Sequence, residues 1–268
     1  MARRRLGQHF LGDPAWRDKI ARLLTADPAG AGGVWIEIGA GHGEMTALLA
    51  KHAGRVVAVE LDRLLLPGLR KLAEALGNVT VAAGDVLSLD LPALAAGRAY
   101  RVYGNIPYYI TSPIVHHLFF SGAPPQAAFL VMQLEVAERL AAPPGGRDYG
   151  YLSAFTQFHA RAEIMLRIPP GAFRPPPKVD SALVALRAPG AGAGLGVADE
   201  AAFADFLKVC FSQKRKTLRN NLRTLAPDRR ARALLEECGI RPDARAEQLT
   251  LAEMARLFSR IRREANSH

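Results

Sequence analysis

Residues 34–43, VWIEIGAGHG, join a short apolar run to a turn that contains three glycines. The run at 34–38 predicts a buried strand, and residues 44–53, EMTALLAKHA, place apolar side chains at helical spacing. A second apolar run at 55–60 then returns to the pattern of a strand. A strand, a helix and a strand at this pitch predict a right-handed crossover between parallel strands. This stretch therefore predicts an α/β fold.

The same alternation continues along the first two-thirds of the chain. A Leu-rich helix is expected from Asp62, and further strands at 78–81, 100–103, 129–132, 160–168 and 181–186, the last two as an antiparallel pair at the sheet edge. Residues 188–200, APGAGAGLGVADE, contain few side chains that pack, which predicts a flexible linker. Helices are expected after it at 203–211, 216–225, 230–238 and 246–261. The sequence thus predicts an α/β domain over 1–190, with a basic arm at 1–8, and a small all-helical domain over 191–268.

Polar groups or bare backbone follow four of the predicted strands in turn. Gly39 and Gly41 follow the first, Glu60 ends the second, Asp85 follows the third and Asn105 follows the fourth. Ligands bind at the carboxyl ends of the strands in open α/β sheets. Glycines expose backbone amides, Glu60 can accept from both hydroxyls of a ribose, and Asp85 can accept from an exocyclic amine. Together these groups suit an adenosine.

The spacing of the glycines separates two classes of adenosine cofactor. A dinucleotide site needs G-x-G-x-x-G, whereas here Gly43 comes one residue early and Glu37 precedes the first glycine. The resulting E-x-G-x-G-x-G form resembles S-adenosylmethionine (SAM) methyltransferases, whose fold is Rossmann-like. A nicotinamide-dependent enzyme for small molecules is therefore disfavoured.

The stretch 104–109, GNIPYY, lies at the strand end where the methyl group of such a cofactor is expected. Asn-x-Pro-aromatic at this place resembles the motif of methyltransferases that act on adenine N6 or similar exocyclic nitrogens. The N6 lone pair of adenine is delocalised into the ring, which makes it a poor nucleophile. The side-chain oxygen of Asn105 and the carbonyl of Ile106 or Pro107 can accept from its N–H bonds and expose that lone pair. Tyr108 offers a face for base stacking, worth about 1–3 kcal/mol. Asn105, Pro107 and Tyr108 are therefore the candidate catalytic residues.

The net charge of +10 is concentrated at the two ends of the chain. Residues 201–268 contain 15 Lys and Arg against 8 Asp and Glu, and residues 3–5 add three arginines. A field of one sign suits a polyanion such as RNA. The expected RNA-contacting side chains recur at near-helical spacing: Lys214, Arg215, Lys216, Arg219 and Arg223.

Other features exclude several classes of protein. The N-terminus lacks the apolar segment of a signal peptide, and the apolar run at 127–132 is too short to cross a bilayer. Cys210 and Cys238 have no Cys-x-x-Cys spacing, which predicts reduced core thiols rather than a metal site or a disulfide. We therefore expect a cytoplasmic protein with no bound metal and no membrane association.

Five segments taken together resemble the KsgA-type small-subunit ribosomal RNA adenine dimethyltransferases. They are QHFL at 8–11, the glycine loop at 37–43, NIPYYITSP at 105–113, FRPPPKVDS at 173–181 and FSQKRKTLRN at 211–220. The resemblance covers nearly the whole chain in order. It implies that SAM donates two methyl groups to N6 of each of two adjacent adenosines in the 3′-terminal hairpin of the small-subunit rRNA. A pre-30S particle is the implied partner, with a role in ribosome biogenesis, and a monomer is expected.

The same resemblance implies roles for individual residues. The matching cofactor positions are His9, Leu11, Gly39, Glu60, Asp85 and Asn105, with Gly41 added from the glycine loop. Phe173 is the aromatic side chain expected to hold the flipped base together with Tyr108. His9 stands where the family commonly has Asn, and its imidazole can still donate or accept near the methionine moiety.

Two alternatives belong to neighbouring functional classes. An erythromycin-resistance methyltransferase shares the Asn-x-Pro-Tyr motif but modifies large-subunit rRNA, and the segments at 173–181 and 211–220 favour the small-subunit family. A non-catalytic RNA-binding assembly factor would have lost Glu60, Asp85 or the Asn-x-Pro-Tyr motif, and all of these are intact.

Overall fold

The computed structural model of the 268-residue chain describes residues 9–26, 32–120, 122–225 and 227–265, so the predicted basic arm at 1–8 lies outside the described residues. The chain forms two compact units. The first consists of residues 1–137 and 163–188, and the second of 138–162 and 189–268. The predicted single boundary near residue 190 is therefore wrong for residues 138–162. Tyr149 and Phe158 in that segment pack into one hydrophobic core with Phe203 of the C-terminal helices.

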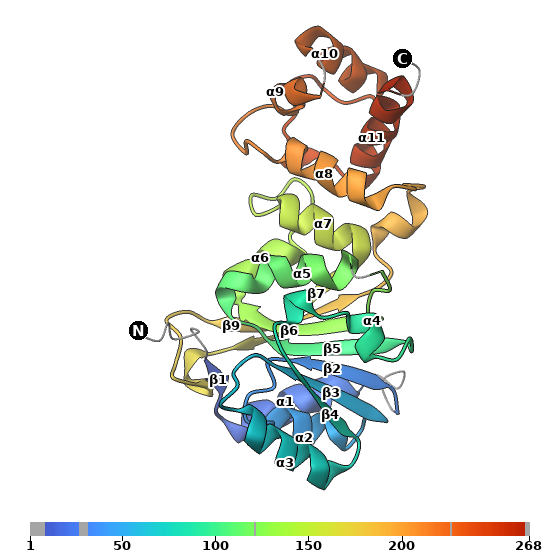
Figure 1. Cartoon of the computed structure of the whole chain (residues 1–268). Coiled ribbons are helices and arrows are strands. Elements are labelled where there is room, and N and C mark those ends of the chain that lie inside the picture. The colour runs from blue at the N-terminus through green and yellow to red at the C-terminus, as the bar shows by residue number, and fades with distance from the viewer. Residues whose placement is uncertain (1–8, 27–31, 121, 226, 266–268) are drawn as a thin grey trace, which may run out of the picture. The chain divides into compact units, whose positions relative to one another are not determined.

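Seven strands form the main sheet of the first unit, in the order β4-β3-β2-β5-β6-β9-β7 (Figure 1). Their bounds are β2 Val34–Ile38, β3 Arg55–Glu60, β4 Val79–Ala83, β5 Tyr100–Asn105, β6 Ala127–Gln133, β7 Arg161–Ile168 and β9 Ser181–Arg187. Neighbours from β4 to β6 pair in parallel, whereas β9 runs antiparallel to β6. The predicted α/β fold is confirmed.

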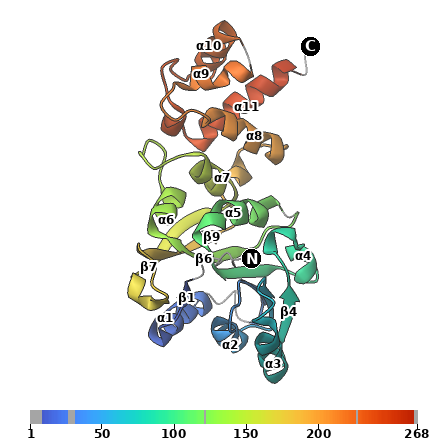
Figure 2. The same ribbon diagram turned by 60° about the vertical axis from the view of Figure 1, so that its left-hand side comes forward.

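Helices cover both faces of this sheet (Figures 1 and 2). On one face lie α1 (Pro14–Thr25), α2 (Glu44–Ala50) and α3 (Leu66–Leu76), and on the other lie α4 (Leu91–Leu94) and α5 (Thr111–Phe120). Every residue of β2 is buried, as parallel strands covered on both faces require. The rings of Trp35 and Phe129 stack 5.8 Å apart in the core that Ile20 and Leu24 of α1 complete.

A second, two-stranded sheet ties the N-terminal segment to a distant part of the same unit. β1 (Phe10–Leu11) pairs antiparallel with β8 (Phe173–Arg174), with Phe10 opposite Arg174 and Leu11 opposite Phe173. The backbone amides of Gly12 and Asp13 both donate to the Ala172 carbonyl, and Asp13 also caps α1 by accepting from the Ala15 amide. These contacts fix the position of the segment that leads into α1.

The second unit is helical. It contains α7 (Tyr151–His159), α8 (Glu200–Cys210), α9 (Leu218–Asn221), α10 (Asp228–Glu237) and α11 (Leu251–Ala265), and the chain enters it within α6 (Leu134–Ala141). Phe203, Leu234 and Leu257 are each at most 1% exposed and belong to one core. In the described ranges, every helix of the protein is too short or too polar to cross a membrane.

The predicted flexible linker at 188–200 is instead packed against α7. It contains a 3₁₀ turn, Ala191–Gly194. A methyl group added at Gly190 would lie 2.4 Å from the Ala160 nitrogen, and one at Gly192 would lie 2.7 Å from the Phe158 carbonyl oxygen. The glycines therefore serve close backbone packing, which composition alone does not distinguish from flexibility.

The predicted helix over 216–225 is also shorter than expected. α9 covers only Leu218–Asn221, and a 3₁₀ turn follows at Leu222–Thr224. The Thr217 side chain accepts from the Asn220 amide and so caps α9. The amide of the buried Asn221 side chain donates to the Cys210 carbonyl. Residues 214–216 therefore lie in the loop between α8 and α9, outside any helix.

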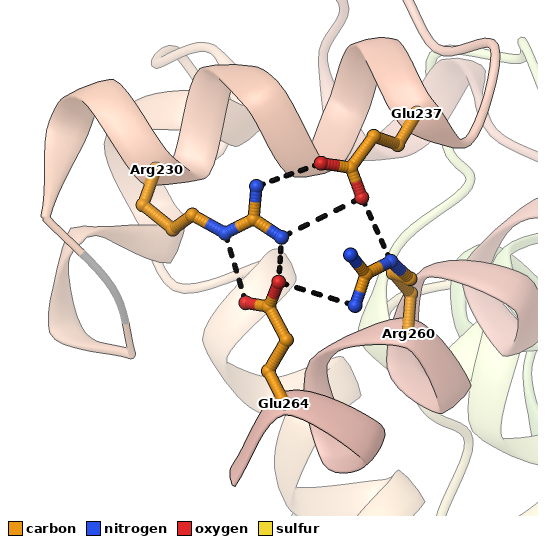
Figure 3. Close-up of polar contacts among 4 residues, drawn as sticks. All are labelled: Arg230, Glu237, Arg260 and Glu264. Carbon is orange, nitrogen blue, oxygen red and sulfur yellow. Dashed lines mark hydrogen bonds and ion pairs between the residues drawn. The ribbon is translucent and has the colours of Figure 1, made fainter. Parts of the chain in front are cut away.

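Four charged side chains join α10 to α11 (Figure 3). Arg230 donates to both Glu237 and Glu264, and Arg260 lies 2.7 Å from Glu237 and 3.1 Å from Glu264. The opposite charges alternate around the cluster, so each carboxylate meets two guanidinium groups. Networks of this kind hold helix ends more effectively than isolated surface pairs.

The packing of the 188–200 segment can be tested with two glycine substitutions. Gly190→Ala should lower the free energy of unfolding by about 1–3 kcal/mol, because the new methyl group overlaps backbone atoms of Ala160 and His159. Gly194→Ala is the matched control: a methyl group there has no neighbour within 4 Å and should change stability by less than about 0.5 kcal/mol. Chemical denaturation followed by circular dichroism measures both. Equal stability of the two variants would show that this segment is a free linker.

Candidate active site

The strand pairing brings the predicted site residues to one edge of the main sheet. Ile38 is opposite both Val59 and Gly104, so the glycine loop lies between the ends of β3 and β5. Three neighbouring pockets share Gly39. We name them by one residue each. The Glu60 pocket also contains Asp85, and the Tyr108 pocket contains Asn105. The third, the Glu37 pocket, is lined by Gly39, Ala40 and Gly41 of the glycine loop.

The glycine loop is held rigidly by hydrogen bonds. Gly39, Gly41 and Gly43 have φ values of 73°, 60° and 86°, which side chains other than glycine rarely adopt. The amides of Gly39 and Ala40 both donate to the Val59 carbonyl, and the Gly41 amide donates to Glu60 Oε2 at 2.7 Å. A methyl group at Gly43 would lie 2.3 Å from a Leu72 side-chain carbon. The loop therefore requires glycine both for its conformation and for its packing against α3.

Glu60 and Asp85 line the same pocket, as the sequence predicted. Glu60 is 2% exposed, and its two oxygens accept from the Gly41 and Asp62 amides, each at 2.7 Å. A carboxylate has further lone pairs, so these bonds orient Glu60 and still leave acceptor capacity for two hydroxyls. Asp85 is exposed and accepts from the Leu87 amide. The side chains of Ile38, Val59, Val86 and Ile110 give this pocket apolar walls that fit the faces of a purine.

Asn105 ends β5 and is oriented by the N-terminal segment. Its side-chain amide nitrogen donates to the His9 carbonyl at 2.8 Å, which assigns the donor and leaves the side-chain oxygen as an acceptor. Pro107 begins a 3₁₀ turn, and its carbonyl accepts from the Ile110 amide. Asn105, Ile106, Pro107 and Tyr108 all line the Tyr108 pocket with Gly39.

Tyr108 faces a second ring across this pocket. The rings of His9 and Tyr108 are 5.8 Å apart and 24° from parallel, and the Tyr108 hydroxyl lies 2.9 Å from the Ser181 hydroxyl. Burial raises the pKa of Tyr108, and the bond to Ser181 opposes this only in part, so the phenol stays neutral. His9 also bonds through Nδ1 to the Pro175 carbonyl at 2.7 Å. The motif at 173–181 thus meets the site through Pro175 and Ser181.

Phe173, the aromatic expected to hold the base, lies elsewhere. It is 1% exposed and packs in the hydrophobic core with Leu11, its partner across β1 and β8. The expectation is therefore wrong for the structure as it stands, because strand pairing points this ring into the core. The ring that faces Tyr108 is His9. Leu11, for which the resemblance implies a cofactor contact, is itself buried and lines the Glu37 pocket.

The five predicted RNA-contacting residues all lie in the second unit, in two groups. Lys214, Arg215 and Lys216 are exposed in the loop before α9, and Lys214 donates to the Arg147 carbonyl at 2.7 Å. Arg219 and Arg223 lie 3.5 and 3.1 Å from Asp228. The predicted single helical face is therefore wrong, because residues 211–217 are not helical and α9 covers only Leu218–Asn221.

Glu37 is a buried acid in the glycine motif. It is 2% exposed, and its Oε2 accepts from the Thr46 hydroxyl. Burial is the main cause that raises its pKa to about 8, and nearby Glu44 and Glu60 add to this while Thr46 opposes it. Arg17, Glu44 and Tyr103 line the same pocket. Glu37 could be found from the sequence because it is part of the glycine motif. Arg17 and Tyr103 belong to no recognisable sequence motif, so sequence reasoning missed them.

Comparison with known proteins identifies the family. The model of the family described as "Ribosomal RNA adenine dimethylase" matches residues 1–263. The chain belongs to this family. It is an enzyme that methylates adenine in ribosomal RNA with SAM as the methyl donor. The resemblance drawn from the sequence is thereby confirmed.

Individual relatives support this membership. The chain is 42% identical to ribosomal RNA small subunit methyltransferase A of Xanthomonas euvesicatoria, over 96% of this chain and 95% of the relative. It is 45% identical to the protein of the same name from Acidobacterium capsulatum, over 95% and 89%. A dimethyladenosine transferase from Plasmodium falciparum superposes with a TM-score of 0.80 at 25% identity, over 96% and 98%. The 23S rRNA methyltransferase ErmE superposes with a TM-score of 0.71 at 28% identity, over 94% of this chain and 99% of ErmE.

The buried state of Glu37 predicts a pH dependence of stability. A carboxyl whose pKa is raised on folding binds more protons in the native state, so stability falls as the pH rises from about 4.5 to about 8. Glu37→Gln removes this titration and should raise the free energy of unfolding relative to wild type by about 1–3 kcal/mol at pH 8, and by much less at pH 5.

The control for this measurement is Glu74→Gln, on α3 of the same unit, whose side chain is exposed. The difference in free energy of unfolding between this variant and the wild type should change little with pH. Urea denaturation of the ligand-free protein between pH 5 and pH 8.5 gives both comparisons. If the difference in free energy of unfolding between Glu37→Gln and the wild type is constant over this range, the raised pKa of Glu37 is contradicted.

Proposed function

We propose that the enzyme dimethylates N6 of two adjacent adenosines in the 3′-terminal hairpin of small-subunit rRNA. One observation carries the proposal: two pockets meet at Gly39. The Glu60 pocket fits an adenosine cofactor, and the Tyr108 pocket offers acceptors for an amine. The relatives named ribosomal RNA small subunit methyltransferase A support the choice of subunit.

The cofactor would lie along the edge of the sheet. Glu60 would accept from the ribose hydroxyls, Asp85 from the adenine amine, and the apolar walls of the Glu60 pocket would hold the purine faces. Gly39 and Gly41 would let the chain approach the cofactor closely, and Leu11 and His9 would close the site from the N-terminal segment. SAM supplies an electrophilic methyl group on a positively charged sulfur.

The target amine would be activated by two oxygen acceptors. Asn105 can offer its side-chain oxygen because its nitrogen is already committed to the His9 carbonyl. The second acceptor is the carbonyl of Ile106, since the Pro107 carbonyl accepts from the Ile110 amide. In the first transfer, accepting both N–H bonds localises the lone pair on N6 and aims it at the methyl group. The monomethylated amine keeps one N–H bond for these acceptors in the second transfer, and each transfer releases one proton to solvent. Positioning and electrostatics can supply most of the catalysis without a general base.

The flipped adenine would insert between two rings. Tyr108 is held by Ser181 and His9 by Pro175, so both faces of the Tyr108 pocket are oriented before the base arrives. Their present separation of 5.8 Å is shorter than the roughly 7 Å that a sandwiched base needs at about 3.5 Å per contact, so one ring must shift slightly. Extrusion of the base also demands RNA contacts away from the pocket.

The second unit would supply these contacts. The exposed loop at 214–216 and the arginines at 219 and 223 would bind phosphates and position the RNA, while the Tyr108 pocket selects the base. We propose a pre-30S particle as the natural substrate, a cytoplasmic location, a role in ribosome biogenesis, and action as a monomer without a metal.

Replacing Asn105 tests the proposed acceptor. Asn105→Ala should lower kcat by about 10²–10³-fold, the usual cost of losing one preorganised hydrogen-bond partner of the transition state. The affinity for SAM should fall by no more than a few fold, because most proposed cofactor contacts remain. Single-turnover methyl transfer and calorimetric titration measure the two effects. Methyl transfer at the wild-type rate would remove Asn105 from the mechanism.

Charge changes in the second unit test the RNA surface. The triple substitution of Lys214, Arg215 and Lys216 by Glu should weaken RNA binding and make its dependence on salt shallower, because fewer phosphate contacts release counterions. Arg241 is an exposed arginine on the same unit, 3.7 Å from Asp243, and Arg241→Glu serves as the control. An unchanged salt slope in the triple variant would place the RNA surface elsewhere.

The proposed substrate is tested by supplying the enzyme with RNA of each ribosomal subunit in turn. Labelled SAM would be supplied with unmethylated 30S particles and, in parallel, with unmethylated large-subunit rRNA, followed by nucleoside analysis. We expect N6,N6-dimethyladenosine in the 30S RNA only. Label in the large-subunit RNA would assign the enzyme to the activity named for ErmE instead, and absence of label with SAM still bound would favour a non-catalytic assembly factor.

A further inference from the structure

Two large side chains at the rim of the Glu60 pocket are exposed to solvent. Tyr109 and Leu61 both line this pocket, yet Tyr109 is 66% exposed and Leu61 is 50% exposed. Leu64, three residues beyond Leu61, is also 66% exposed. Exposed apolar surface beside a binding site commonly marks the place where a ligand is bound. The proposed function gives none of these side chains a role.

The turn that contains Tyr109 explains why its ring faces outward. Tyr108–Ile110 is a 3₁₀ turn, in which the Ile110 amide donates to the Pro107 carbonyl. With three residues per turn, successive side chains point about 120° apart. Tyr108 lines the Tyr108 pocket and Ile110 is a wall of the Glu60 pocket, so the ring between them is left at the rim. Pro107 lines both pockets, so this turn forms the boundary between them.

The charges at this rim favour a neutral group over a phosphate. The charged side chains that line the Glu60 pocket are Glu60 and Asp85, and both are acidic. Asp62 follows Leu61 directly and accepts from the Leu64 amide, so a third carboxylate lies close by. A phosphate at the rim would be repelled by these groups. A nucleobase is uncharged and presents a flat face, which suits an exposed tyrosine ring.

Extrusion of the target adenosine creates a need for such a ring. An adenosine that leaves its stack removes one stacking partner from the nucleotide beside it. Adjacent nucleotides share a phosphate, so a strand that delivers one base to Tyr108 brings the next nucleotide close to the same turn. Exposed aromatic side chains stack with single-stranded bases of any sequence. The residue that follows Tyr108 in the turn is Tyr109.

We propose that Tyr109 is the stacking platform for the base next to the methylated adenosine, with Leu61 as a further apolar contact at the rim. Tyr109 is a positioning residue, because it holds the strand while Tyr108 holds the target base, and it does not touch the reacting atoms. The inference rests on the proposed placement of the target base in the Tyr108 pocket. It does not depend on which ribosomal subunit supplies the RNA.

Steady-state kinetics on the ribosomal RNA substrate tests the platform. Tyr109→Ala should lower kcat/KM for RNA about 5- to 150-fold, the range expected when one stacking ring is removed. The loss should lie mainly in KM, because the contact is the same in the bound state and in the transition state. Tyr109→Phe keeps the ring and should restore the wild-type KM. Wild-type kinetics in Tyr109→Ala, or an equal defect in Tyr109→Phe, would overturn the proposal.

Calorimetric titration with S-adenosylhomocysteine separates this role from a contact with the cofactor. Tyr109 lines the pocket proposed for the adenine of the cofactor, so a ring that covers that adenine would lower the affinity for S-adenosylhomocysteine when removed. We expect Tyr109→Ala to bind S-adenosylhomocysteine as the wild type does. A loss of this affinity as large as the loss in kcat/KM for RNA would assign Tyr109 to the cofactor and overturn the proposal.

Phe120→Ala is the matched control for the loss of an exposed ring. Phe120 is 44% exposed and ends α5, the helix that begins directly after the turn with Tyr109. Its ring stacks with that of His116 at 6.0 Å, at the opposite end of the helix from Tyr109. This variant should keep the wild-type kinetics and the wild-type affinity for S-adenosylhomocysteine. An equal kinetic defect in Phe120→Ala would count against a specific role of the rim.

The fluorescence of 2-aminopurine reports stacking directly. This base analogue would be placed in turn at each of two adjacent adenosines in the loop of a hairpin RNA and at the nucleotides that flank them. With S-adenosylhomocysteine bound and the RNA saturated with protein, one position beside the target should be more quenched by the wild type than by Tyr109→Ala. Equal fluorescence with the two proteins at every position would contradict the platform. Since no methyl transfer is measured, failure of the small-subunit assignment would leave this result unaffected.

Discussion

The parallel pairing of β2 with β3 on one side and β5 on the other is the constraint on which the site depends. It places three carboxyl ends side by side, so that Gly39, Glu60 and Asn105 become neighbours although 66 positions separate the first from the last. No local contact could assemble this set. Helices cover both faces of these strands, which is why the strands are largely apolar; before their last residues the charged exceptions are Glu37, Arg55 and Arg101.

A second layer of interactions fixes the orientation of the groups at that edge. Glu60 is bound by two backbone amides, Asn105 by the His9 carbonyl and Tyr108 by Ser181. Each of these partners comes from a different part of the chain, and the pairing of β1 with β8 brings the N-terminal segment close enough to take part. The site is thus organised in the free protein, and preorganised acceptors are what methyl transfer to a weakly nucleophilic amine requires.

The sequence predicted those features that depend on local pattern. Strands of apolar residues, the glycine loop, and the polar residues at the strand ends all follow from spacing, and the structure places Glu60, Asp85 and Asn105 at one edge of the sheet. What failed depended on tertiary packing. Phe173 is drawn into the core by its strand partner, Gly190 and Gly192 pack tightly where composition indicated flexibility, and the helix expected from residue 216 starts only at Leu218. Tyr103 gave no signal because it joins Glu37 in one pocket only through the alignment of β5 with β2.

The most direct test of the central claim is a crystal structure of the enzyme with S-adenosylhomocysteine bound. We expect the ribose hydroxyls on Glu60, the adenine in the pocket that contains Asp85, and the sulfur facing the Tyr108 pocket beside Asn105. Modelling the transferred methyl group on that sulfur should place it within about 3–3.5 Å of an amine held by Asn105 and Ile106. A nucleoside bound away from Glu60, or a sulfur that points away from Asn105, would contradict the account in which the edge of one parallel sheet aligns donor and acceptor.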